Sequence, residues 1–404
     1  MIDSADVVVI GSGGLGAATA FSLVRHGARN VAIVDKHEIA SQTSPRAAGL
    51  MSHARTSDLM VQLVTQAGSN LRRFTEDTGQ PLDWTQSGSL KVARRAQDVD
   101  VIESDVARGD RLGLDVERIS PDEAHRLNPF LQTKGVLAVM RVGDDLYFEP
   151  SQVAIGFARG AEAGGATLLP HTTVTRVDIE DGEVAAVETD RGTIRTRVVV
   201  DAAGAWTRQV AEASGIHIPI LPTRHQLFVT EPLEGASADL PIVRVVDAAV
   251  YVRPCDGGLL WGGFEADPHF FEVDALGASF QIEDTPLDAE VLLRLGEQVA
   301  EQLPILLEAK VREHRGGIPT MTGDGEHIVG PLPGARGFFV AGGCNVAGLS
   351  VSPAIGEALA AWIVDGEPPI DLAPLSITRF AEPYPEERLE RDAAWQYRHF
   401  YGAA

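Results

Sequence analysis

Residues 6–35 constrain the fold of this chain more than any other stretch. A β-branched run at residues 7–10 leads into Gly-Ser-Gly-Gly-Leu-Gly at residues 11–16, and an alanine-rich helical pattern follows. A second apolar run at residues 31–34 ends on Asp35. Strand, glycine turn, helix, strand and acidic residue in this order are typical of a dinucleotide-binding unit. We therefore predict an α/β protein built on a Rossmann-like domain.

The glycines of this turn have separate physical roles. Gly11 allows the sharp turn, Gly13 lets a pyrophosphate approach the backbone, and Gly16 lets the helix lie close to the sheet. The helix N-terminus offers unpaired N–H groups and a partial positive charge to the phosphates. We expect Asp35 to bind the ribose hydroxyls. A structural turn without a ligand is the alternative interpretation.

The bulk properties exclude several classes of function. A chain of 404 residues predicts two domains, and a net charge of −23 argues against nucleic acid and anionic membranes as partners. Cys255 and Cys344 are too few for a disulfide framework or a metal cluster, so we expect no metal site and a cytoplasmic location. No apolar run approaches the roughly 20 residues of a membrane span. The first strand begins too early to leave room for a signal peptide.

The pattern of predicted helices and strands changes in the middle of the chain. Charged helical sequence is expected over residues 95–127, and a helix with Ser151 as its N-cap is expected to follow. Asp181-Gly182 predicts a hairpin turn. Beyond residue 219, short strands predict a mostly antiparallel sheet, with strands at residues 226–230, 249–253, 259–262 and 270–273. A buried strand at residues 337–343 and a helix at residues 352–363 repeat the strand–turn–helix pattern of the N-terminal region.

Motifs far apart in the chain accompany the first glycine turn, at residues 201–206, 320–325, 337–343 and 353–357. Together they resemble the D-amino-acid-oxidase-like FAD oxidoreductases, which include sarcosine and glycine oxidases. Four further features resemble the dimethylglycine and sarcosine dehydrogenase branch, at residues 47–50, 225–226, 251–253 and 262–265. In that branch a folate-binding module often follows the flavin part. We expect none in a sequence that ends at Ala404.

The resemblance implies an FAD-binding domain assembled from separate segments and a substrate domain with a mostly antiparallel sheet. The FAD-binding domain is predicted at residues 1–83, 146–217 and 316–404, and the substrate domain at residues 84–145 and 218–315. The residues expected to bind FAD are Gly11, Gly13, Gly14, Gly16, Asp35, Lys36, Ser44, Arg46, Ala48, Gly49, Leu50, Val174, Ala203, Gly204, Trp206, Gly343, Asn345, Val346, Gly348, Leu349 and Ser350.

A second glycine turn supports FAD over a nicotinamide cofactor on physical grounds. Gly342 and Gly343 connect a buried strand to a helix far along the chain from the first turn. The N-terminus of that helix would stabilise negative charge on the pyrimidine edge of a reduced flavin. A nicotinamide enzyme has no need of this second site. An ordinary strand–helix turn is the open alternative.

The resemblance also implies a catalytic pair. His225 and Tyr251 match the histidine and the tyrosine that face the flavin in the dimethylglycine-oxidising branch. Amine oxidation needs a neutral nitrogen, and a histidine hydrogen-bonded to a phenol is suited to accepting the amine proton. A histidine that only supports its strand is the alternative interpretation.

An arginine is expected to bind a substrate carboxylate. Tyr251 and Arg253 are two residues apart on a strand, so their side chains share a face, and a bidentate guanidinium orients a carboxylate strongly. A solvated arginine at a strand edge is the alternative. Arg46 is a second substrate-binding candidate, and the sequence does not rank the remaining candidates, which are Arg55, Arg224 and Arg315.

Three positions depart from the family patterns. Arg46 stands where the branch often has the histidine that bonds covalently to FAD, and Gly317 stands where monomeric sarcosine oxidase has its flavin-linking cysteine. Trp261 falls about where that oxidase has an oxygen-activating lysine. The electron acceptor is therefore left open between oxygen and an electron-transfer partner.

The expected function is FAD-dependent oxidation of the C–N bond of a secondary or tertiary amino acid, with N-methylated substrates favoured. Hydride transfer to the flavin would be followed by hydrolysis of the imine. One alternative is a glycine or D-amino-acid oxidase acting on a primary amine. Another is the flavin-bearing, β-type subunit of a hetero-oligomeric complex resembling sarcosine oxidase. A homo-oligomer is equally compatible with the sequence.

The departures at Arg46 and Gly317 predict that FAD is bound without a covalent link. Acid precipitation of the yellow protein should release all of the flavin into the supernatant, where its absorbance is measured. Yellow colour that stays with the pellet would reveal a covalent bond at another residue.

Overall fold

The first apolar run forms strand β1 (Val7–Ile10) in the middle of a six-stranded sheet. The computed structural model describes residues 2–277, 279–380 and 384–402. Strands β2 (Val31–Val34) and β13 (Val198–Asp201) run parallel to β1 on either side. The sheet order is β21-β22-β13-β1-β2-β9, in which β21 alone is antiparallel to its neighbour. The remaining strands are β9 (Thr167–Leu169), β21 (Ile328–Pro331) and β22 (Phe338–Gly342).

Both faces of this sheet are covered, so β1 and β2 are apolar and buried along their whole length. On one face lie helices α1 (Gly14–Arg25), α2 (Asp58–Arg72), α3 (Phe74–Thr78), α6 (Pro150–Ala163) and α10 (Gly348–Asp365). On the other face lie helix α7 (Thr207–Ala213) and a small antiparallel sheet of β10 (Val174–Glu180), β11 (Glu183–Thr189) and β12 (Gly192–Arg195). The hairpin predicted at Asp181-Gly182 connects β10 to β11.

Helices α1 and α10 approach each other closely because small residues line their crossing. A Cβ atom on Gly356 would lie 2.6 Å from the backbone carbon of Ala18. Likewise, a Cβ atom on Gly16 would lie 2.0 Å from the carbonyl oxygen of Gly11. Any side chain at either glycine would push α1 away from the sheet or from α10. These glycines therefore allow α1 to lie close to both the glycine turn and α10.

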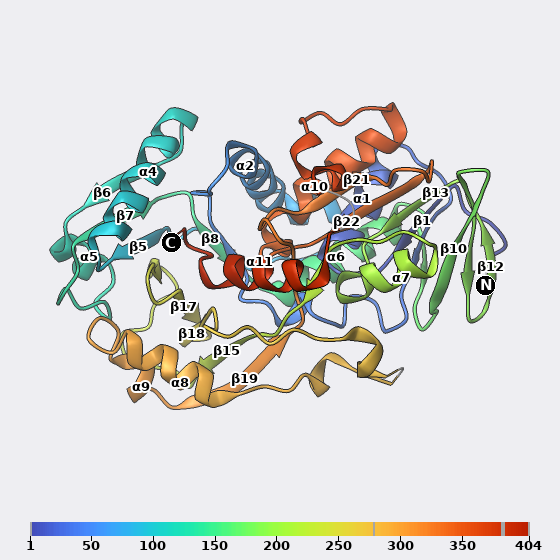
Figure 1. Ribbon diagram of the computed structural model, residues 1–404. Helices are drawn as coiled ribbons and strands as arrows, with labels where there is room; N and C mark the ends of the chain where they lie inside the picture. Colours follow the sequence, from blue (N-terminus) through green and yellow to red (C-terminus); the bar gives the residue numbers. More distant parts are fainter. Residues whose placement is uncertain (1, 278, 381–383, 403–404) are drawn as a thin grey trace.

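The strand-rich parts of the chain form a second, eight-stranded sheet of order β19-β15-β18-β17-β16-β5-β7-β6 (Figure 1). All neighbours are antiparallel except β16 and β5. Its strands are β5 (Ser89–Ala93), β6 (Val116–Ile119), β7 (Ala138–Val142), β15 (His225–Thr230), β16 (Ile242–Val245), β17 (Val250–Cys255), β18 (Gly258–Gly263) and β19 (Val311–Gly317). A parallel Rossmann-like sheet beside a mostly antiparallel one confirms the expected fold class.

Shorter elements complete the part of the chain that the structure describes. The helices beside the large sheet are α4 (Ala96–Leu112), α5 (Pro121–Leu127), α8 (Ala289–Gln298) and α9 (Ile305–Glu308). Small two- and three-stranded sheets contain β3 (Leu50–Met51), β4 (Trp84–Thr85), β8 (Leu146–Phe148), β14 (Leu221–Pro222) and β20 (Thr320–Met321). None of the described helices combines the length and the apolar composition that crossing a bilayer requires.

Four local predictions were wrong. Strand β6 interrupts the helical stretch expected over residues 95–127. Residues 270–273 form no strand, and only an isolated bridge joins Phe270 to Thr223. Helix α6 starts earlier than expected, with Glu149 rather than Ser151 as its N-cap. Helix α10 starts at Gly348, four residues before the predicted start.

The C-terminal helix α11 (Glu386–Arg398), red in Figure 1, packs against one face of the large sheet. Its buried residues Leu389, Ala393 and Tyr397 contact the cluster that contains Leu227 and Tyr251. The assignment of residues 316–404 to the FAD-binding domain, like the other domain boundaries, stays a prediction. Residues 1, 278, 381–383 and 403–404 of the predicted ranges lie outside the described residues.

Candidate active site

A cavity of about 630 Å³ lies at the carboxyl ends of the central parallel strands, where Ile10, Val34 and Ala202 line it. Ligands of open α/β sheets bind at this edge. The volume falls within the roughly 300–1,000 Å³ of small-molecule sites. From there the cavity extends to the large sheet, because His225 and Tyr251 line it as well.

The first glycine turn forms one end of the cavity. Gly11 has a φ of +95°, and a Cβ atom there would lie 2.4 Å from the carbonyl oxygen of Ala202. Gly13 has ordinary extended backbone, and its missing Cβ would meet only the Ser44 hydroxyl, at 3.3 Å. Ser44 accepts a hydrogen bond of 2.9 Å from the Gly14 N–H. The turn therefore leaves open backbone beside a polar hydroxyl at the start of α1.

Asp35 supports this turn as well as lining the cavity. Its Oδ2 accepts hydrogen bonds from the backbone N–H and the hydroxyl of Ser12, at 2.8 and 2.5 Å. Its Oδ1 accepts a hydrogen bond of 2.9 Å from the His37 N–H. The carboxylate thereby ties the glycine turn to the segment after β2. Lys36 lies over the Trp206 ring, 3.8 Å from its centroid, and burial lowers the pKa of Lys36 to about 8.

A second helix N-terminus, that of α10, faces the same cavity. Asn345 and Val346 before it have φ values of +44° and +59°, which is unfavourable for a β-branched residue such as Val346. The Asn345 side chain holds this conformation, because it accepts from the Thr322 N–H at 3.0 Å and donates to the Gly343 carbonyl at 2.7 Å. Neither α1 nor α10 has an acidic residue in its first turn, so both leave their positive ends for a ligand.

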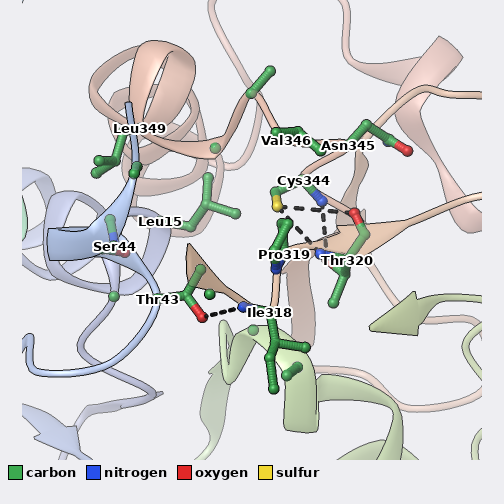
Figure 2. Close-up of a pocket in the computed structure, with 18 of the residues that line it drawn as sticks. Leu15, Thr43, Ser44, Ile318, Pro319, Thr320, Cys344, Asn345, Val346 and Leu349 are labelled. Atoms are coloured by element: carbon green, nitrogen blue, oxygen red, sulfur yellow. Dashed lines mark hydrogen bonds between the residues drawn. The ribbon is translucent and has the colours of Figure 1, made fainter. Parts of the chain in front are cut away.

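Figure 2 shows the part of the cavity where the two helix starts lie opposite the segment from Ile318 to Thr320. The Ile318 N–H donates a hydrogen bond of 3.1 Å to the Thr43 hydroxyl. At the adjacent Gly317, a Cβ atom would lie 2.9 Å from Thr43. A flavin-linking cysteine at position 317 would therefore need Thr43 to move. At the other end of this segment the Cys344 N–H donates a hydrogen bond of 3.1 Å to the Thr320 hydroxyl.

The cavity residues fit a dinucleotide with two anionic regions. The open backbone at Gly13 and the start of α1 suit a pyrophosphate, and the start of α10 suits the electron-rich edge of a reduced ring. Of the predicted FAD-binding residues, all except Gly16 and Gly343 line the cavity. Gly16 instead contacts the Gly11 carbonyl beneath the turn, and Gly343 packs against Thr322. The individual contacts with FAD stay a prediction.

One row of side chains across the large sheet faces the cavity. Strand register places these residues side by side on β15, β18, β17, β16 and β5, in the order Leu227, Gly262, Tyr251, Arg244 and Lys91. Gly262 makes room for the Tyr251 ring, because a Cβ atom there would lie 2.6 Å from the phenol oxygen. The neighbouring Trp261 points to the opposite face, where its ring contacts Phe228. Trp261 therefore does not occupy the place in the cavity that an oxygen-activating lysine would need.

His225 and Tyr251 meet at the cavity wall. The His225 Nε2 lies 3.0 Å from the Tyr251 hydroxyl oxygen. The Phe264 ring lies 4.9 Å from the imidazole, measured between centroids. Burial lowers the pKa of His225 to about 3 and raises the pKa of Tyr251. Both side chains are therefore neutral at neutral pH, and the imidazole has one ring nitrogen with a lone pair that can accept a hydrogen bond.

The candidate arginines differ in their partners and in whether they line the cavity. Arg253 does not line the cavity: its Nε donates to the Ala48 carbonyl at 2.6 Å, and Nη1 donates to the Pro254 carbonyl at 2.7 Å. Arg224 forms a buried, bidentate ion pair with Glu265. Arg46 lines the cavity, but its Nε donates to the Gly316 carbonyl at 2.6 Å.

Arg55 lines the cavity and keeps its positive charge without an acidic partner. Its guanidinium donates to the Ser52 carbonyl and the Ser350 hydroxyl, both at 3.0 Å, and it forms no ion pair among the described residues. Burial, and next the charge of Arg244, lowers the pKa of Arg55 to about 10. Arg244 has its own carboxylate, because its Nη1 donates to Asp145 at 2.9 Å.

Sequence reasoning did not identify several residues at the site. Arg244 and Lys91 line the cavity through the parallel β16–β5 pairing, which brings together strands far apart in the chain. His327 lines it with both ring nitrogens buried and unpaired among the described residues. Tyr397 contacts His225 from the C-terminal helix. None of these residues lies in a motif, so the sequence carries no signal for them.

The match to a family model now defines the class of protein. The model of the FAD dependent oxidoreductase family (DAO) matches residues 6–362. The chain therefore belongs to this family, which confirms the resemblance found in the motifs, and FAD is the family's cofactor.

The similar proteins include mouse mitochondrial sarcosine dehydrogenase, which is 32% identical over 93% of this chain and 41% of the relative. Rat mitochondrial dimethylglycine dehydrogenase is 29% identical over 94% of this chain and 45% of the relative. This chain thus spans less than half the length of either relative. The crystal structure of glycine oxidase from Geobacillus kaustophilus superposes with a TM-score of 0.81 at 26% identity, covering 94% of this chain and 100% of that chain.

Replacing Gly13 by valine should abolish FAD retention without unfolding the protein. The backbone at Gly13 is extended and a Cβ atom there would meet only the Ser44 hydroxyl, which must move by a few tenths of an ångström. The fold should therefore tolerate valine, while the side chain blocks the approach of a pyrophosphate. The ratio of flavin to protein absorbance after purification, together with circular dichroism, checks this. Ala96→Val, at an exposed position on α4, is the control. Full flavin content in Gly13→Val would show that the cofactor lies elsewhere.

Proposed function

We propose that this protein oxidises the C–N bond of a secondary or tertiary amino acid, with an N-methylated amino acid as the favoured substrate. The observation that carries the proposal is the neutral His225–Tyr251 pair, which lines the same cavity as the dinucleotide-binding turn. We further propose that FAD is held there without a covalent bond, by the cavity-lining residues described above.

FAD bound in this cavity would accept a hydride, which carries two electrons, from the substrate carbon next to nitrogen. The protein must first provide an amine without its extra proton, because a protonated nitrogen has no lone pair to form the C=N bond. His225 and Tyr251 can hold that proton. Water then adds to the C=N bond of the released imine and the C–N bond breaks. The products are formaldehyde and a demethylated amine, or a keto acid if the other C–N bond is oxidised.

Arg55 is the residue we propose for binding the substrate carboxylate, in place of Arg253. Its side chain is partly buried, lines the cavity and forms no ion pair among the described residues. A buried charge is unfavourable until an opposite charge pairs with it. A substrate carboxylate would supply that charge and would be oriented by the planar guanidinium. Arg46 remains a second candidate for the same role because it also lines the cavity.

Apolar side chains beside the catalytic pair support a methylated nitrogen over a primary amine. Leu227 and Phe264 line the cavity next to His225 and offer contacts to a methyl group. The similarity to sarcosine and dimethylglycine dehydrogenases points the same way. A glycine or D-amino-acid oxidase is the second candidate, favoured by the close superposition with glycine oxidase. The same chemistry in a flavin-bearing subunit of a larger complex is a third candidate.

His225→Ala should slow anaerobic flavin reduction by about 10²- to 10⁴-fold near pH 7, the usual contribution of a general base. The loss should shrink at high pH, where the substrate amine is already neutral. Stopped-flow absorbance at matched flavin occupancy measures the rate. His217→Ala, which removes a surface histidine paired with Glu212, is the control. Equal rates for the parent and His225→Ala at pH 7 would contradict the catalytic role of the pair.

A further inference from the structure

The C-terminal helix α11 brings a second tyrosine to His225. The Tyr397 hydroxyl oxygen lies 2.8 Å from the His225 Nδ1 and 3.0 Å from the Arg224 carbonyl oxygen. Tyr397 has no exposed surface, although it is one of the largest side chains in the protein. His225 thus has one phenol on each ring nitrogen: Tyr251 at the cavity and Tyr397 behind it.

The Arg224 carbonyl decides the direction of these hydrogen bonds. A carbonyl oxygen can only accept, and a tyrosine hydroxyl has one proton to donate. Tyr397 must therefore donate its proton to Arg224, which leaves its oxygen to accept from His225. A neutral imidazole carries one N–H, so that proton lies on Nδ1 and Nε2 carries a lone pair.

We propose that Tyr397 is a positioning residue that fixes His225 in the Nδ1–H tautomer and thereby makes the Tyr251 oxygen a proton acceptor toward the cavity. Because Nε2 has no proton, the Tyr251 hydroxyl donates to it, and the lone pairs of the Tyr251 oxygen are left for the substrate. An N–H of a substrate ammonium is complementary to this arrangement. The part of this inference that concerns the substrate rests on the proposed function. The assignment of the His225 tautomer does not.

In the resulting proton transfer, one proton leaves the substrate nitrogen and one proton arrives at the His225 Nε2. The substrate N–H bond breaks and its proton goes to the Tyr251 oxygen, while the Tyr251 O–H proton goes to the His225 Nε2. The amine becomes neutral, Tyr251 is regenerated as a phenol, and His225 becomes an imidazolium whose Nδ1–H still donates to Tyr397. Because burial lowers the pKa of His225, this imidazolium carries the proton only transiently. No electron moves in this step.

Other charged and titratable groups lie around this chain of hydrogen bonds. The Arg224–Glu265 ion pair lies next to Tyr397, and Tyr401, Arg315 and Arg253 act on Tyr251 from a distance. Phe264 contacts the His225 ring on its remaining side. Among the described residues, the two tyrosines are the recorded hydrogen-bond partners of the imidazole.

Removing the Tyr397 hydroxyl should invert the tautomer. In Tyr397→Phe the Nδ1 faces a ring without an acceptor, so a proton on Nδ1 would be buried and unpaired. The proton then moves to Nε2, which donates to Tyr251, and the Tyr251 hydroxyl proton turns toward the cavity. A donor would then face the substrate ammonium, and the amine could no longer lose its proton along this route.

Nitrogen NMR of the FAD-bound protein tests the tautomer directly, without substrate. In protein labelled with ¹⁵N-histidine, the His225 signals are assigned by their loss in His225→Gln. We expect a protonated Nδ1 and an unprotonated Nε2 in the parent, the reverse in Tyr397→Phe, and the parental pattern in Tyr384→Phe. Tyr384→Phe is a matched control because it removes a hydroxyl bonded to Asp392, next to the same helix. A protonated Nε2 in the parent would overturn the proposal whether or not the variant folds.

Flavin reduction provides the functional readout. At matched flavin occupancy, Tyr397→Phe should reduce about 10- to 100-fold more slowly at pH 7, less than the loss of the general base itself, and should recover at high pH. Tyr384→Phe should reduce at the parental rate. An unchanged rate in Tyr397→Phe despite an inverted tautomer would overturn the positioning role. If the tautomer is as proposed but no methylated amino acid reduces the flavin of the parent, the proposed function fails and the tautomer assignment stands.

Discussion

The close crossing of α1 and α10 is the constraint on which the rest of the site depends. Gly356 lies against the Ala18 backbone and Gly16 lies against the Gly11 carbonyl, so neither helix can move away without opening a gap. The crossing brings two helix N-termini without acidic residues to one cavity. Two positive helix ends at one cavity favour an anionic, two-part ligand over a neutral one. Cofactor choice thus follows from helix packing.

Helix α10 contains a proline whose missing backbone hydrogen bond is replaced by a side chain. Pro353 lies inside the helix and cannot donate a hydrogen bond to the Leu349 carbonyl. The Ser352 hydroxyl donates to that carbonyl instead, at 3.1 Å. The strained Val346 before the helix is held by the Asn345 side chain. Strain in this segment is therefore confined to the residues that face the cavity, which is where functional sites concentrate it.

The sequence predicted the nucleotide-binding half well because its signals are local. The turn at residues 11–16 and the hairpin at Asp181-Gly182 depend on neighbouring residues alone. The start of α10 was missed because Gly348 and Pro353 are both poor helix formers. Strand β6 was missed because its exposed Glu117 and Arg118 break the alternation of a strand.

The substrate half was harder to predict because its geometry depends on strand register. A one-residue difference separates Trp261, which faces the protein core, from Gly262, which faces Tyr251. Arg253 shares a strand with Tyr251 but lies beyond the cavity, and Arg55 reaches the cavity from a segment before α2. Tyr397 contacts a histidine 172 residues earlier in the chain. No spacing in the sequence encodes such a contact.

We propose that the cavity selects amino acids with a methylated nitrogen. Anaerobic mixing of the yellow protein with sarcosine, dimethylglycine, glycine and D-alanine, followed by flavin absorbance, tests it most directly. We expect sarcosine or dimethylglycine to bleach the flavin, and glycine and D-alanine to do so far more slowly. Rapid bleaching by glycine or D-alanine, with none by the methylated amino acids, would contradict it.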